Sequence, residues 1–214
     1  NYLTYFPTKS QLNILKERSI LNYLKKKKPK YLIHLAGLSR PMSDHNTNIK
    51  KSIDLNIIGT ANIVKVSEKL KIKLIYFSSS YVYPGKKGNY KENDPVLPIN
   101  NYAWSKLGGE CSVKLYNNSL IIRASMTEKP FVHKAAFSDF LTNFIFHEDI
   151  APKVFKLLHQ KGVINFGGKS QSVFQFAKQY NPKIKRISYK KIFGKSYPAN
   201  TSMNLSKIKK VLKK

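Results

Sequence analysis

A tyrosine and a lysine four residues apart, Tyr102 and Lys106, are of types that could carry out proton transfer. On a helix this spacing places both side chains on one face. A nearby ammonium group favours the phenolate and lowers the pKa of the tyrosine, which could then exchange a proton with a carbonyl oxygen. The spacing alone is not specific, because it also occurs at Tyr5/Lys9, Tyr23/Lys27 and Tyr83/Lys87.

The surroundings of Tyr102 distinguish it from those other pairs. It opens an amphipathic helix predicted over 102–116, which follows a strand that ends in hydroxyl residues. The residues predicted to face the core at helical spacing are Trp104, Leu107, Cys111 and Leu115. Tyr102 and Lys106 then share another face with Gly109, where the absence of a side chain permits close approach of a backbone or a ligand. We therefore interpret Tyr102 and Lys106 as a functional pair.

The elements that must position this pair alternate between strand and helix. Short apolar runs predict strands at 31–35, 74–77 and 119–123, and an apolar stripe predicts a helix over 52–70. This order is typical of an α/β fold with a doubly wound parallel sheet, Rossmann-like, in which ligands bind beyond the carboxyl ends of the strands. The strand ends expected to line one crevice are 36–37, 78–80 and 123–126. Further along, the pattern predicts a loop over 84–101, a helix at 149–160, a strand at 163–166 and a basic helix from Asn204.

Several stretches in the right order resemble the extended short-chain dehydrogenase/reductase family and, within it, the dTDP-4-dehydrorhamnose reductase type. The matching stretches are His34-Leu-Ala-Gly37, Asn56-Ile-Ile-Gly-Thr60, Phe77-Ser-Ser-Ser-Tyr-Val-Tyr-Pro-Gly85, Asn89-Tyr-Lys-Glu-Asn-Asp94, Pro98 and Tyr102-Ala-Trp-Ser-Lys-Leu-Gly-Gly-Glu110. Motifs that occur together in order are far more specific than a single Tyr/Lys pair. Weaker similarity continues through 120–125, 143–149 and 162–168.

The resemblance implies a role for each matching position. Tyr102 corresponds to the catalytic acid/base, Lys106 to the lysine that holds the nicotinamide ribose and lowers the tyrosine pKa, and Ser79 to the catalytic hydroxyl that hydrogen-bonds the substrate oxygen. The cofactor-binding positions are Asn13, Ile14, Leu35, Ala36, Gly37, Phe77, Tyr102 and Lys106, with Asn13 in place of the family's aspartate near the adenine. The substrate-binding positions are Ser80, Tyr81, Ser125 and Met126. For Asn56, a structural bond to backbone and a cofactor role remain equally open.

The same resemblance implies an NADPH- or NADH-dependent reduction of a 4-keto-6-deoxy sugar nucleotide, with NADP or NAD as cofactor. A dehydratase is disfavoured, because such enzymes have an Asp-Glu pair where this chain has Ser80 and Tyr81. A sugar-nucleotide epimerase of the same superfamily remains an alternative. A scaffold or remnant without catalytic activity is another.

One family feature is missing from the sequence. The resemblance implies a Gly-x-x-Gly-x-x-Gly turn upstream of Asn13, and this sequence has none. We therefore expect an N-terminally truncated fold that binds cofactor poorly, because that turn supplies backbone donors and a helix N-terminus to the pyrophosphate. Residues 1–125 are expected to form the cofactor-binding core, with 145–168 returning to it. Residues 126–214 are expected to form mainly a small substrate-binding portion.

Composition narrows the remaining classes of function. The chain of 214 residues carries a formal charge of +28, yet only four of its 39 basic residues are arginines, the side chain that reads base edges. Lysine-rich nucleic-acid binding is therefore the least favoured alternative, and no specific nucleic-acid partner is expected. Apolar runs are too short for a membrane helix, which favours a soluble cytoplasmic protein. A sugar-nucleotide substrate is expected as partner, and a homodimer is left open.

The cysteine and the histidines predict no metal chemistry. A single cysteine, Cys111, excludes an internal disulfide and any site made of several thiolates, and we expect it to be a small core residue. The residues that could suggest a metal site are His133, His147, Glu148 and Asp149. Their spacing matches no familiar zinc pattern, so no metal is expected.

Overall fold

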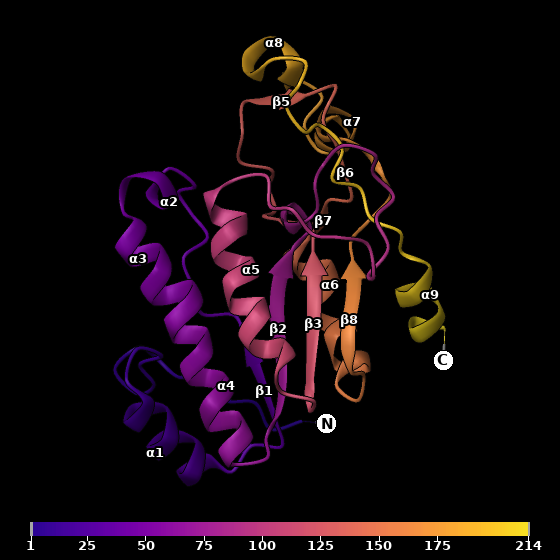
Figure 1. Cartoon of the computed structure of the whole chain (residues 1–214). Helices are drawn as coiled ribbons and strands as arrows, with labels where there is room; N and C mark the ends of the chain where they lie inside the picture. The colour runs from indigo at the N-terminus through magenta and orange to yellow at the C-terminus, as the bar shows by residue number, and fades with distance from the viewer. Residues whose placement is uncertain (1, 214) are drawn as a thin grey trace.

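A parallel four-stranded sheet with the strand order β1-β2-β3-β8 forms the centre of the protein (Figure 1). The computed structural model describes residues 2–213. The strands are β1 (Tyr31–His34), β2 (Lys73–Ser79), β3 (Ser119–Ala124) and β8 (Gly162–Phe166). Every residue of β2 and β3 is buried, as expected for central parallel strands that are covered on both faces. These strands confirm the strands predicted from the sequence.

Helices α1, α4 and α5 cover one face of the sheet (Figure 1). The elements on this side are α1 (Glu17–Lys27), α2 (Asp44–Thr47), α3 (Ile49–Ile53), a π-helical turn η1 (Asp54–Ile58), α4 (Gly59–Lys69) and α5 (Asn101–Lys114). The single helix predicted over 52–70 is therefore interrupted by η1. Such π-helical turns are frequent at functional sites. Ile20, Ile63, Leu74 and Val113 belong to the hydrophobic core between this layer and the sheet.

The opposite face of the sheet is covered by α6 (His147–Val154), a 3-10 turn η3 (Phe155–Leu157) and α9 (Ser206–Leu212). Phe77, Ile122, Ile150 and Ile208 pack together in this second core. Helices on both faces of a parallel sheet confirm the expected α/β, Rossmann-like class. Within residues 2–213 no helix is long and apolar enough to cross a membrane.

Short elements extend beyond the carboxyl ends of the main strands, at the top of Figure 1. They are η2 (Ser80–Val82), β4 (Met126–Thr127), β5 (Ala135–Phe137), β6 (Leu141–Thr142), β7 (Ile145–Phe146), β9 (Gln171–Ser172), α7 (Val173–Lys178), β10 (Lys185–Ile187) and α8 (Tyr189–Phe193). The strands pair as β4 with β7, β5 with β10 and β6 with β9. An aromatic core that includes Phe131, Phe140, Phe146 and Phe176 holds this part together.

The buried face of α5 differs from the prediction. Trp104 is 51% exposed, Leu115 is 86% exposed and Cys111 is also exposed, so the prediction that these residues face the core is wrong. The helix instead buries small and polar residues, because its backbone lies close to η1. A Cβ atom at Gly109 would lie only 2.5 Å from the backbone oxygen of Asn56. The apolar spacing identified a helix but not the side that packs.

The buried side chain of Arg123 connects the long loop before α5 to the sheet through hydrogen bonds. Arg123 of β3 donates from Nη2 and Nε to the two carboxylate oxygens of Glu110 over 2.6 and 3.2 Å. Its Nη1 also donates to the Tyr83 hydroxyl over 2.9 Å and to the Glu92 carbonyl over 3.1 Å. The Tyr83 hydroxyl in turn donates to Asn165 of β8 over 2.8 Å. These bonds satisfy two fully buried charges, which would otherwise be strongly unfavourable.

Candidate active site

Ser79 and Tyr102 meet at the carboxyl end of β2. Ser79 ends the strand, and its hydroxyl accepts a hydrogen bond from the backbone N–H of Tyr81 over 3.2 Å. Tyr102 lies in the first turn of α5, which is capped by Asn100 through a bond from the backbone N–H of Ala103 over 2.8 Å. The Ser79 hydroxyl is also close enough to the Tyr102 phenol to lower the pKa of that phenol. A phenol and a hydroxyl are thereby placed where both could contact one substrate oxygen.

The phenol of Tyr102 holds its proton more firmly than an ordinary tyrosine. Burial raises its pKa, and the opposing effects of the Ser79 hydroxyl and the Arg40 charge are smaller. We expected Lys106 to lower this pKa, and the structure contradicts that expectation. The ammonium of Lys106 instead lies 4.4 Å from the centre of the Tyr76 ring. Tyr102 is therefore a protonated acid at neutral pH.

Lys106 lies one helical turn behind Tyr102, as the spacing predicts. Burial lowers the pKa of Lys106 to about 8, while Glu110 acts in the opposite direction. The neighbouring His34 has its pKa lowered to about 3, mainly by burial and also by Lys106. His34 is therefore neutral at physiological pH, with its Nε2 atom 3.0 Å from the Thr60 hydroxyl. Lys106 is therefore a partly buried cation, one helical turn from Tyr102, at the position matched to the family lysine.

Asn56 forms structural hydrogen bonds to backbone, which is one of the two roles that the sequence left open. Its Oδ1 accepts from the backbone N–H of Leu38 over 2.7 Å, and its Nδ2 donates to the Leu38 carbonyl over 2.9 Å. The same Nδ2 lies 2.8 Å from the hydroxyl of Ser105. Asn56 thus connects the segment after β1 with α5, and it fixes the position of the helix that carries Tyr102.

The predicted cofactor residues are divided between surface and interior. Leu35, Ala36 and Gly37 form an exposed turn directly after β1, with Leu35 68% exposed. Phe77 and Ile14 are buried in the two main cores, where their side chains serve packing. Asn13, the residue before Ile14, accepts a bond from the backbone N–H of Leu15 over 3.0 Å. Besides Tyr102 and Lys106, the turn at 35–37 is therefore the part of this set that is available to a ligand.

The predicted substrate residues lie around the same strand ends. The Tyr81 ring packs edge-on against Tyr102, with ring centres 6.5 Å apart, and against Phe140 at 6.2 Å. Burial raises the pKa of Tyr81 to about 12. Ser80 is buried, and the Ser125 hydroxyl lies 2.8 Å from that of Thr142. Met126 is partly exposed in β4.

Two further residues near Tyr102 were not identified from the sequence. Arg40 forms an ion pair with Glu128, which joins the segment after β1 to the residue after β4. His45 is buried beside Tyr102 with ring centres 5.2 Å apart, and its Nδ1 lies 2.7 Å from the Ser52 hydroxyl. Arg40 lies in an irregular segment and His45 in the four-residue helix α2, which is too short to show a periodic pattern, so no sequence signal pointed to them.

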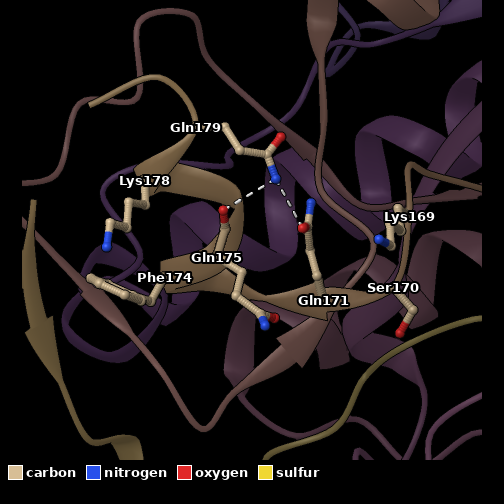
Figure 2. Close-up of a pocket in the computed structure, with 7 residues that line it drawn as sticks. All are labelled: Lys169, Ser170, Gln171, Phe174, Gln175, Lys178 and Gln179. Atoms are coloured by element: carbon tan, nitrogen blue, oxygen red, sulfur yellow. Dashed lines mark hydrogen bonds between the residues drawn. The ribbon is translucent and has the colours of Figure 1, made fainter. Parts of the chain in front are cut away.

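The hollow shown in Figure 2 does not coincide with this constellation. It has a volume of about 620 Å³ and is lined by Lys169, Ser170, Gln171, Phe174, Gln175, Lys178 and Gln179. Gln179 donates to the side chain of Gln171 over 3.0 Å and to the carbonyl of Gln175 over 3.2 Å. None of the predicted site residues lines this hollow, so it does not belong to the constellation around Tyr102.

The parallel sheet with helices on both faces has the Rossmann-like fold of the short-chain dehydrogenase/reductase family. The model of the RmlD substrate binding domain matches residues 1–149. The chain therefore belongs to the RmlD family. The expected resemblance to dTDP-4-dehydrorhamnose reductases is confirmed at the level of family and fold.

The chain is similar to several solved structures and curated proteins. The structure of dTDP-4-dehydrorhamnose reductase from Bacillus anthracis in complex with NADP has a TM-score of 0.83 at 22% identity, with 96% of this chain and 82% of that chain covered. A hypothetical dTDP-4-dehydrorhamnose reductase from Sulfolobus tokodaii has a TM-score of 0.79 at 25% identity, with 93% and 80% covered. Methionine adenosyltransferase 2 subunit beta from Xenopus laevis is 36% identical over 107 residues, which are 50% of this chain and 31% of that protein. The match thus spans about a third of the curated relative.

The residues at the strand ends fit the nicotinamide end of a dinucleotide. The phenol of Tyr102 and the ammonium of Lys106 are hydrogen-bond donors of the kind that ribose hydroxyls accept. The turn at 35–37 brings exposed backbone to the same edge, and a Cβ atom at Gly37 would lie 2.7 Å from Oδ1 of Asn56. A buried hydroxyl without a hydrogen-bond partner among the described residues, that of Ser78, lies beside Ser79 in β2.

Proposed function

We propose that this chain carries the proton-transfer residues of an NADPH- or NADH-dependent reductase that acts on a keto sugar nucleotide. The observation that supports the proposal is that the Ser79 hydroxyl, at the carboxyl end of β2, lies close enough to the Tyr102 phenol to influence its pKa. In open α/β sheets this edge is where ligands bind. The preferred substrate is a 4-keto-6-deoxy sugar nucleotide, in keeping with the RmlD family.

The reduction adds a hydride to the carbonyl carbon and a proton to its oxygen. The hydride is what a bound nicotinamide cofactor supplies. Tyr102 donates the proton, since its raised pKa keeps the phenol protonated until the oxygen becomes strongly basic. Ser79 donates a hydrogen bond to the same oxygen as negative charge develops there. The phenolate then recovers a proton from solvent.

The neighbouring residues suggest how a substrate is oriented. Arg40 is a partly exposed cation close enough to Tyr102 to affect its pKa, and it is suited to the phosphates of a sugar nucleotide. Tyr81, with its edge against Tyr102, offers an apolar wall to the sugar. Ser80, Ser125 and Met126 are proposed as further substrate contacts, and the exposed turn at 35–37 as a cofactor contact.

The proposal is tested by following NADPH or NADH oxidation with a 4-keto-6-deoxy sugar nucleotide and this chain. Tyr102→Phe removes the proton donor and should lower kcat by about 10²-fold or more. Ser79→Ala removes one donor to the oxygen and should lower kcat by about 10-fold to 10²-fold. Tyr197→Phe, at a tyrosine that is 52% exposed, is the matched control and should leave the rate unchanged. A turnover rate that Tyr102→Phe does not affect would refute the assignment.

A second candidate function is a binding subunit without reductase activity. It is favoured by the match to methionine adenosyltransferase 2 subunit beta, whose name refers to a subunit of a different enzyme. Under this alternative the chain binds NADPH or NADH, weakened by Lys106→Met, but no 4-keto substrate is turned over. Turnover that depends on Tyr102 would exclude it.

A further inference from the structure

A basic hollow lies at the amino ends of the strands, opposite the edge that carries Tyr102. Its lining residues come from segments that precede or begin β1, β2, β3 and β8, at the lower end of the sheet in Figure 1. They are Lys30, Tyr31, Lys71, Lys73, Asn118, Leu158, His159 and Lys161. The hollow has a volume of about 300 Å³. It is therefore formed by tertiary structure and not by one run of lysines.

Lys73 distinguishes this hollow from the many exposed lysines of the chain. Its side chain is only 7% exposed, and its Nζ atom is buried without a hydrogen-bond partner among the described residues. The backbone holds it there, since Lys73 opens β2 and its N–H donates to the Lys30 carbonyl over 3.2 Å. An unpaired buried ammonium is unfavourable unless an anion compensates it.

The charges around Lys73 do not supply that anion. The lining contains four lysines and no acidic residue. Glu68 lies nearby but is already paired with Lys71, over 2.7 Å. Lys161 adds a second positive charge near Lys73, and together with the larger effect of burial it lowers the pKa of Lys73 to about 8. Lys73 still carries most of its charge at neutral pH, so the hollow attracts anions.

We propose that this hollow binds a phosphate-type oxyanion, with Lys73 at its base and Lys161 at its rim. Its volume is at the lower end of the range for small-molecule sites, which suits inorganic phosphate, pyrophosphate or the phosphate end of a small ester. Ammonium groups bind such oxyanions through charge-assisted hydrogen bonds. Asn118 and Tyr31 also line the hollow, and the Tyr31 hydroxyl lies 3.3 Å from Nδ1 of His159. This site lies apart from the proposed reductase site and does not depend on that function.

The proposal is tested by calorimetric titration of the 214-residue chain with inorganic phosphate and with pyrophosphate, at an ionic strength held constant with chloride. Lys73→Met should weaken binding by about tenfold or more, because one charge-assisted bond is lost. The variant is expected to fold, since methionine fills a similar space and removes an unpaired buried charge. Lys161→Met, at an exposed position, should also weaken binding. Lys191→Met removes an exposed charge from α8 and is the matched control.

Either of two results would overturn the proposal. One is that neither phosphate nor pyrophosphate binds better than chloride. The other is that binding is the same in Lys73→Met, Lys161→Met and the unmodified chain. A titration with glycerol phosphate separates a phosphate ester from the free ion as the preferred form. Oligonucleotide binding is measured for the same variants. If Lys191→Met weakens it as much as Lys73→Met does, anion binding depends on the overall charge of the chain, and the proposed site is refuted.

Discussion

Replacing Arg123 by methionine should destabilise the protein severely. Arg123 is 1% exposed and Glu110 is not exposed at all, and the substitution leaves the Glu110 carboxylate buried without its partner. Removing one member of a buried ion pair typically costs about 3–5 kcal/mol. Since domains are stable by about 5–15 kcal/mol, this is a large share of the total. For a chain of this size it corresponds to a fall in Tm of about 6–20 °C.

The physical origin of this loss can be separated by a double-mutant cycle. Glu110→Met alone should be similarly destabilising, because it leaves the guanidinium of Arg123 unpaired. The double variant with methionine at both positions should be more stable than either single variant, since no buried charge remains. Chemical denaturation followed by circular dichroism gives the free energy of unfolding for all four proteins. Glu17→Gln, which breaks an exposed ion pair with Lys65, is the control and should cost under about 1 kcal/mol.

The cycle also links stability to the candidate site. Arg123 fixes Tyr83 and the Glu92 carbonyl, and these belong to the stretch that leads into Tyr102. We therefore expect Arg123→Met to lower reductase activity even below its Tm. If Arg123→Met costs no more than Glu17→Gln, or if the double variant loses the sum of the two single losses, the argument about an unpaired buried charge is wrong.

Three further predictions concern the helix that carries the site. Burial lowers the pKa of Lys106 to about 8, so its positive charge is lost as the pH rises through that value. We therefore expect kcat/KM to fall there, and a profile that stays level through pH 8 would contradict a role for that charge. Gly109→Ala places a methyl group 2.5 Å from the Asn56 carbonyl oxygen and should lower the free energy of unfolding, measured in urea, by about 1–3 kcal/mol. In Gly108→Ala the methyl group meets only a side chain, so the loss should be smaller. Equal losses in the two variants would count against close backbone packing at Gly109. Cys111 is exposed and should react fully with a thiol reagent in the folded protein, and protection from the reagent would show that the helix buries a different face.

The sequence predicted the central sheet because its signals are local. Short apolar runs mark β1, β2 and β3, and small or hydroxyl residues lie at or soon after the carboxyl end of each strand. The Tyr102/Lys106 spacing required only that 101–114 be helical, which it is. Ser79 could be paired with Tyr102 because parallel strands and their crossover helices bring such ends together.

The prediction for the buried face of α5 failed for a physical reason. Trp104, Cys111 and Leu115 satisfy helical spacing as well as the true buried face does, and spacing cannot show which side has room for a neighbour. The close approach at Gly109 and the ion pair of Glu110 decide the orientation. Both depend on segments far away in the sequence, the turn η1 and strand β3.

The sequence by itself determined the α/β class and the main strands, because these rest on the periodicity of neighbouring residues. The serine, tyrosine and lysine were predicted from a resemblance to a family whose motifs occur in the same order in this chain. Only the tertiary structure decided how these groups are protonated and what surrounds them. Burial raises the pKa of Tyr102, Lys106 lies over the Tyr76 ring, and Lys73 reaches the base of a basic hollow. Desolvation and electrostatic interaction depend on distances between segments that are remote along the chain, and no local pattern encodes those distances.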